Sequence, residues 1–296
     1  MLATDSAAFS PFLFSFSAMG CPCELQFYAK NNAFAQHVAQ RVIADINRLE
    51  QRYSRYRADS FLSKINQVAA SGGSISVDGE TAGLLNYAQT CYELSDGLFD
   101  ITSGILRRAW RFETNVLPDD KSIQALLQKV GWQHIRWENP TLTFLQAEME
   151  IDFGGIVKEY AADRAATLCL NSGILHGMVN LGGDIKIIGA HPDGSAWRVG
   201  IQHPRDKTKV WKTVVLKTGA LASSGDYERC MVIDGVRYGH ILNPKTGYPV
   251  RHLAAVSVVA DFCVVAGSAA TVAMLKETKG EKWLKSLGLQ NYTFKN

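Results

Sequence analysis

The second half of the chain is a succession of short apolar runs, and this feature limits the possible folds more than any other. Glycine and polar residues bound each run, which is typical of β-strands. Strands in such number, combined with helices, predict an α+β protein with a mixed or antiparallel sheet. The predicted strands are residues 178–181, 185–188, 197–202, 213–217, 230–233 and 254–259.

Helical periodicity is clear over residues 33–53, where apolar residues recur every three or four positions: Val38, Val42, Ile46 and Leu49. Residues 20–29 alternate as a strand does, and residues 141–145 and 148–152 predict a hairpin. Further helices are predicted at 81–95, 122–130, 156–171, 264–275 and 281–287. Because no Pro- or Ser-rich linker divides the chain, we expect one large domain at residues 15–296, with packed helices, after an N-terminal extension at residues 1–14.

Composition excludes several classes of protein. Basic and acidic residues nearly balance, 31 against 28, for a net charge of +3, so nothing indicates a partner nucleic acid. No apolar run reaches the ~18 residues that predict a membrane span. Six scattered cysteines are typical of reduced thiols in a reducing compartment. The first ten residues contain no lysine or arginine, unlike a signal peptide, so the predicted location is cytoplasmic.

Four stretches of glycine and polar residues interrupt otherwise core-like sequence, at 97–100, 152–158, 181–184 and 240–247. In the second, Gly154 and Gly155 separate a strand from a helix, an arrangement in which backbone N–H groups can bind an anion. Lys158 lies in the first helical turn, where the helix dipole disfavours a cation, so an anionic ligand explains it better than helix stability. A simple turn with a solvent-facing lysine remains the alternative.

His240 is the one histidine beside a turn-forming segment of fixed conformation, Asn-Pro-Lys-Thr-Gly at 243–247. A histidine in such a place can be structural, or it can act as a general base near pH 7. No G-x-S-x-G elbow accompanies it. The residues alone leave both interpretations open.

The order of the motifs is more specific than any one of them. The chain resembles the ApbE-like FAD:protein FMN transferases over about residues 15–290, which implies a flavin transferase-like catalytic domain. The motifs are MG at 19–20, YSRYRADSFLSKIN at 53–66, GLFDITSG at 97–104, IDFGGIVKEYAADRAA at 151–166, VNLGGDI at 179–185, ALASSGDY at 220–227 and HILNPKTGYPV at 240–250.

The resemblance implies a covalent flavinylation, a post-translational modification. FMN would pass from FAD to a threonine or serine hydroxyl of an acceptor flavoprotein, with AMP released. His240 matches the family histidine that activates the hydroxyl. The implied FAD-binding residues are Met19, Tyr56, Leu98, Phe99, Asp100, Asp152, Lys158 and Ile241.

The resemblance also implies Mg²⁺, held by the Gly155 carbonyl and by Thr271 of a D-x-x-x-T motif. Here Gly267 replaces the aspartate of that motif, and Glu159 stands where the family commonly has glycine. A glutamate is tolerable within a helix, but Mg²⁺ usually has a carboxylate ligand. Two alternatives therefore accompany the transferase: a flavin-binding protein with a degenerate metal site and no activity, and an FAD pyrophosphatase that yields AMP and FMN.

Overall fold

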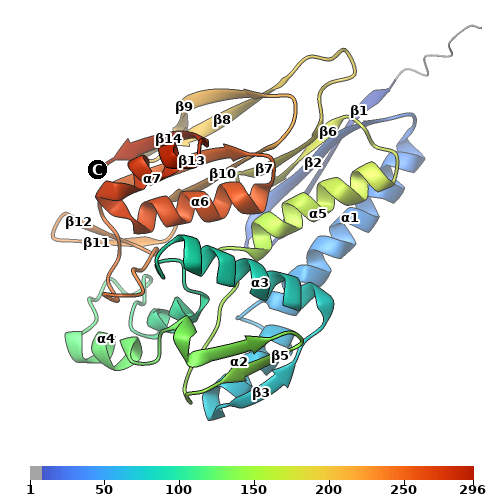
Figure 1. Ribbon diagram of the computed structural model, residues 1–296. Helices are drawn as coiled ribbons and strands as arrows, with labels where there is room; N and C mark the ends of the chain where they lie inside the picture. Colours follow the sequence, from blue (N-terminus) through green and yellow to red (C-terminus); the bar gives the residue numbers. More distant parts are fainter. Residues whose placement is uncertain (1–8) are drawn as a thin grey trace, which may run out of the picture.

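A seven-stranded sheet forms the centre of the molecule (Figure 1). The computed structural model describes residues 9–296; the predicted extension, residues 1–14, therefore lies largely outside the described residues. Every neighbouring pair in the sheet is antiparallel. In spatial order the strands are β1 (Ser10–Ala18), β2 (Cys21–Ala29), β6 (Gly177–Leu181), β7 (Asp184–Gly189), β10 (Ala220–Gly225), β13 (Leu253–Ala260) and β14 (Gln290–Lys295).

Three helices cover one face of this sheet: α1 (Asn32–Tyr53), α5 (Val157–Asn171) and α6 (Cys263–Leu275). The side chain of Asn31 caps α1 by accepting the Phe34 N–H, and the predicted apolar stripe from Val38 to Leu49 is buried. The α+β class and the packed helices are thus confirmed. No helix among residues 9–296 has both the length and the apolar character needed to cross a membrane.

The opposite face is covered by a hairpin of β8 (Trp197–His203) and β9 (Asp206–Leu216). Trp197, Val199 and Ile201 of the hairpin form a second apolar cluster with Ile185 and Leu221 of the sheet. The central strands are therefore buried on both faces, as their continuous apolar sequence requires.

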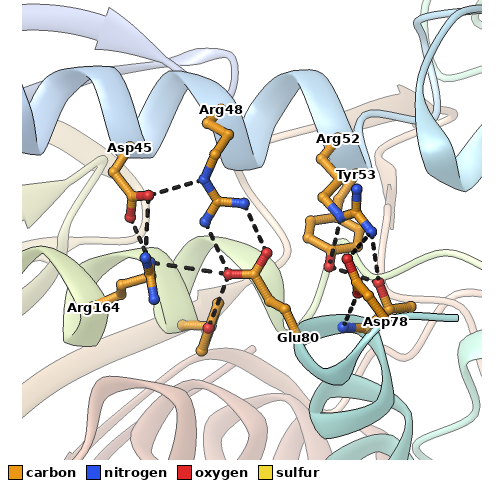
Figure 2. Close-up of polar contacts among 9 residues, drawn as sticks. Asp45, Arg48, Arg52, Tyr53, Asp78, Glu80 and Arg164 are labelled. Atoms are coloured by element: carbon orange, nitrogen blue, oxygen red, sulfur yellow. Dashed lines mark hydrogen bonds and ion pairs between the residues drawn. The ribbon is translucent and has the colours of Figure 1, made fainter. Parts of the chain in front are cut away.

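A smaller lobe packs beside α1. It contains α2 (Phe61–Ser71), α3 (Gly79–Leu94) and a three-stranded sheet in the order β3 (Gly73–Ser76), β5 (Thr141–Phe144), β4 (Ile135–Glu138). Figure 2 shows how charged side chains join it to the main body: Arg48 of α1 donates to both oxygens of Glu80 on α3, at 2.7 and 2.9 Å, and Arg164 of α5 lies 3.9 Å from the same carboxylate.

The remaining elements are short. They are η1 (Ile101–Arg108), α4 (Asp120–Leu127), η2 (Trp132–His134), β11 (Cys230–Ile233), β12 (Val236–Gly239), η3 (Glu277–Lys279) and α7 (Gly280–Ser286). A third apolar cluster, which includes Trp110, Ile123 and Leu242, joins η1 and α4 to the segment after β12.

The predicted hairpin of residues 141–145 and 148–152 is wrong. Strand β5 pairs with β4 and β3 instead. The Asn66 side chain of α2 takes both backbone groups of Ile151, since its oxygen accepts the Ile151 N–H at 2.8 Å and its nitrogen donates to the Ile151 carbonyl at 3.0 Å. This side chain replaces a strand partner, and it fixes the backbone just before Asp152.

Candidate active site

A cleft of about 1050 Å³ lies at the amino-terminal end of α5, between the main sheet and the smaller lobe. Such a volume is at the upper end of the range for small-molecule sites. Every site residue singled out from the sequence lines this one cleft, although they come from positions 19 to 271. They are Met19, Tyr56, Leu98, Phe99, Asp100, Asp152, Gly155, Lys158, His240, Ile241 and Thr271.

Met19 reaches the cleft through a tight turn. It forms with Gly20 the two-residue loop between β1 and β2, because Ala18 pairs with Cys21. Both loop residues have positive φ, 52° and 72°, as a type I′ hairpin turn requires. A left-handed conformation is unfavourable for methionine, so the pairing of the two strands holds Met19 at the rim of the cleft.

Asp152 organises two arginines that sequence analysis missed. Its Oδ2 lies 3.0 Å from Arg55 Nη1 and 3.1 Å from Arg107 Nη1, while Oδ1 accepts the Gly154 N–H at 2.9 Å. Arg55 also pairs with buried Glu150 at 2.9 Å. Because the Asp152 carboxylate is fully engaged, it positions guanidinium groups in the cleft rather than presenting free oxygens to a ligand.

Asp100 is engaged in the same way. Its carboxylate accepts the Thr102 N–H at 2.8 Å and the Trp132 N–H at 3.1 Å, and burial raises its pKa.

Phe99 is buried beside Gly155, where an added Cβ would lie 3.3 Å from the ring. Tyr56, by contrast, is 71% exposed, and its hydroxyl accepts from Arg229 at 2.9 Å. The Tyr56 ring is thus available to a planar ligand.

Lys158 points toward the sheet from the first turn of α5, which has no side-chain cap. Its Nζ lies 2.7 Å from Oδ2 of buried Asp184. Burial opposes a charge on Lys158, but Asp184 and Glu159 outweigh it and raise its pKa. The ammonium group therefore stays charged at the uncapped start of a helix, where both features attract an anion. The solvent-facing alternative for this lysine does not fit this contact.

The neighbouring Glu159 is 7% exposed, and its Oε2 has no hydrogen-bond partner within residues 9–296. Burial, reinforced by the charge of Asp184, raises its pKa to about 7. A buried carboxylate without a partner is unfavourable. The sequence predicted only a tolerable helix residue at this position. The packing shows that its carboxylate oxygen Oε2 is buried without a hydrogen-bond partner within residues 9–296.

His240 lies between two cavities. It lines the main cleft and also a second cavity of about 530 Å³, whose walls include Trp110, Arg111 and Arg229. Its Nδ1 is buried and has no hydrogen-bond partner in the described part of the chain. Burial, with help from the charges of Arg107 and Arg229, lowers its pKa to about 4. The imidazole is therefore neutral at pH 7 and can accept a proton.

Thr271 lies on α6, and its hydroxyl is 2.8 Å from Ser224 Oγ. The Thr271 hydroxyl and the Gly155 carbonyl are hard oxygen donors of two residues that line the cleft. Over the described range 9–296, no three His, Cys, Asp or Glu side chains gather in a way that could hold a metal ion.

Comparisons with known proteins agree with this geometry. At the sequence level, the chain is 32% identical over 241 residues to a FAD:protein FMN transferase of Vibrio cholerae, covering 79% of this chain and 71% of the relative. It is 30% identical to the Escherichia coli K12 protein of the same name, covering 86% and 75%.

Solved structures are similar over almost the whole chain. The ApbE protein of Thermotoga maritima superposes with a TM-score of 0.87 at 30% identity, covering 97% of this chain and 94% of that one. The flavin transferase ApbE of Vibrio cholerae gives 0.85 at 27% identity, covering 96% and 93%. The model of the ApbE family matches residues 19–293. The chain therefore belongs to the ApbE family, as the order of its motifs predicted.

Proposed function

We propose that this protein transfers FMN from FAD to a threonine or serine hydroxyl of an acceptor flavoprotein and releases AMP. The observation that carries the proposal is the position of neutral His240, which lines both the main cleft and the second cavity that adjoins it. Relatives that are 30–32% identical are named FAD:protein FMN transferases, which favours this reaction over flavin storage or FAD hydrolysis.

The cleft provides the groups that FAD requires. Tyr56 and Met19 offer apolar surface at the rim for the flavin ring system. The pyrophosphate would lie against the Lys158 ammonium group and the uncapped N–H groups at the start of α5. Phosphoryl transfer depends largely on such positioning and charge neutralisation.

The acceptor would enter through the second cavity. His240 would take the proton of its hydroxyl, and the hydroxyl oxygen would attack the phosphorus of the FMN half. The new O–P bond forms as the pyrophosphate bond breaks, and AMP leaves with the bridging oxygen. The pKa of about 4 belongs to the ligand-free protein; pyrophosphate charge beside the ring would raise it and improve the base.

We also propose that Mg²⁺ assists, held by the Gly155 carbonyl and the Thr271 hydroxyl, both of which line the cleft. When bound, Mg²⁺ neutralises charge that develops on the transferred phosphoryl group. Two neutral oxygens alone are a weak site for this ion. The residue that supplies a carboxylate ligand therefore has to be identified.

A single catalytic domain at residues 15–296 is part of the proposal, supported by the family match at 19–293. All six cysteines are free thiols, which supports a reducing compartment such as the cytoplasm.

Intact-mass spectrometry tests the function. The protein is incubated with FAD and an acceptor domain that carries a flavinylation threonine, with Mg²⁺ or with a chelator. We expect the acceptor to gain the mass of FMN linked through a phosphoester, and the chelator to slow the gain. An acceptor of unchanged mass beside intact FAD would contradict the proposal.

A further inference from the structure

The unpartnered carboxylate of Glu159 lies next to a missing side chain. Gly267 is buried in the interior of α6, and a Cβ added to it would lie 2.6 Å from Glu159 Cγ and 2.7 Å from Oε1. These distances are too short for any side chain at position 267 while Glu159 keeps its place. Glycine at 267 therefore lets the Glu159 side chain keep this place, and any larger residue there would displace it.

Glycine within a helix is itself unfavourable, by about 1 kcal/mol relative to alanine. Helix α6 otherwise consists of small and apolar residues that pack closely on α5 and the sheet. Glycine at position 267 is therefore explained if another group needs the space that a side chain would fill. The Glu159 side chain lies in that space.

Glu159 also lines the same cleft as the two residues whose oxygens are assigned to the cation. Thr271 follows Gly267 by four residues and so lies on the same face of α6. Gly155 lies just before α5, whose first turn carries Glu159. Both of these residues and Glu159 line the cleft. The ammonium group of the adjacent Lys158 contacts Asp184 at 2.7 Å, and Glu159 Oε2 has no hydrogen-bond partner within residues 9–296.

We propose that Glu159 supplies the carboxylate of a divalent-cation site whose other protein oxygens are the Gly155 carbonyl and the Thr271 hydroxyl, and that Gly267 provides the space for it. The carboxylate would thus come from α5 and not from position 267 of α6. One carboxylate with two neutral oxygens suits Mg²⁺, which usually keeps several waters and binds substrate phosphates as well. This inference rests on the proposed function for the identity of the ligand in the cleft.

Mn²⁺ binding tests the site without any enzyme assay. Mn²⁺ is titrated into the metal-stripped full-length protein, alone and with FAD, and bound ion is measured by electron paramagnetic resonance. We expect Glu159→Gln to weaken Mn²⁺ binding by at least about tenfold. Glu228→Gln is the matched control, because Glu228 is an exposed glutamate at the same cleft, and it should keep the wild-type affinity within a few-fold. Equal Mn²⁺ affinity of Glu159→Gln and wild type in both titrations would overturn the proposal.

Two further variants separate ligation from folding. Gly267→Ala keeps the Glu159 charge but displaces its carboxylate, so Mn²⁺ binding should fall; unchanged binding would count against the proposal. Exchanging the two positions, Glu159→Gly with Gly267→Asp, should restore binding if only the location of the carboxylate matters.

Thermal unfolding gives a second readout. Mn²⁺ should raise the Tm of the wild type but not of Glu159→Gln, whereas a purely structural Glu159 would lower Tm in that variant and leave the Mn²⁺ effect intact. FAD binding is measured separately by flavin fluorescence. A protein that does not bind FAD would contradict the proposed function, whereas the Mn²⁺ titration tests the cation site.

Discussion

Replacing Asp152 with asparagine tests how far the cleft depends on one buried carboxylate. Asparagine keeps the size of the side chain, and its oxygen can still accept the Gly154 N–H. It removes the negative charge that lies 3.0 Å from Arg55 and 3.1 Å from Arg107. Arg55 would keep its contact with Glu150 at 2.9 Å, a carboxylate that Arg108 also contacts at 2.9 Å, and Arg107 would lose the carboxylate that it contacts at 3.1 Å.

The magnitude follows from the burial of the partners. Removing one partner of a fully buried ion pair is destabilising by about 3–5 kcal/mol. The effect here should be smaller, because Arg107 is 31% exposed and Arg55 keeps Glu150. We expect a loss of about 2 kcal/mol in the free energy of unfolding, or roughly 3–5 °C in Tm for a chain of this size.

Chemical denaturation with urea, followed by tryptophan fluorescence, measures this loss. The matched control is Asp59→Asn, which breaks the exposed pair of Asp59 with Arg57 and should change stability by no more than about 0.5 kcal/mol. Asp152→Asn should also weaken FAD binding by about tenfold, because the arginines and the Gly154 turn lose their common anchor. Equal stability of the two variants would refute the reasoning.

Three predictions concern the residues that face the ligand. His240→Ala should bind FAD with near wild-type affinity but lose about 10²–10⁴-fold in transfer rate; normal transfer would remove it as the base. In the ligand-free protein, NMR should show His240 titrating near pH 4. Because this pKa lies below the unfolded value, its contribution to stability is complete above about pH 6.5 and is lost as pH falls toward 4; a midpoint above 6 would contradict the burial argument. Lys158→Met should weaken FAD binding more than riboflavin binding, measured by fluorescence quenching, and an equal loss for both would place the lysine away from the phosphates.

Much of the fold can be predicted from the sequence, because the apolar residues that alternate or recur at helical spacing are the ones buried in the structure. The stripe of α1 is one example, and the antiparallel strands β6, β7 and β13 are others. The predicted hairpin failed because a side chain, Asn66, satisfies the Ile151 backbone, and no local pattern records such a long-range contact. Strands β4, β10, β12 and β14 were not predicted.

The candidate site, like the fold, was predicted only in part from the sequence. The resemblance to the family implied one site for residues as distant as Met19 and Thr271, and both line one cleft. The ion pairs of Arg55 and Arg107 with Asp152 were missed, because charge pairing across the fold has no spacing rule in the sequence. Glu159 and Gly267 each looked like an isolated departure from a motif, and they are linked only by the packing, since a Cβ added to Gly267 would lie 2.6 Å from Glu159 Cγ.

The most direct test of the central claim is the stoichiometry of the products. The protein, FAD and an acceptor domain are incubated, and chromatography measures AMP, free FMN and acceptor-bound FMN in one sample. The account predicts one AMP for each FMN attached to the acceptor, with little free FMN. Equal amounts of AMP and free FMN, with no flavin on the acceptor, would contradict it and identify a pyrophosphatase.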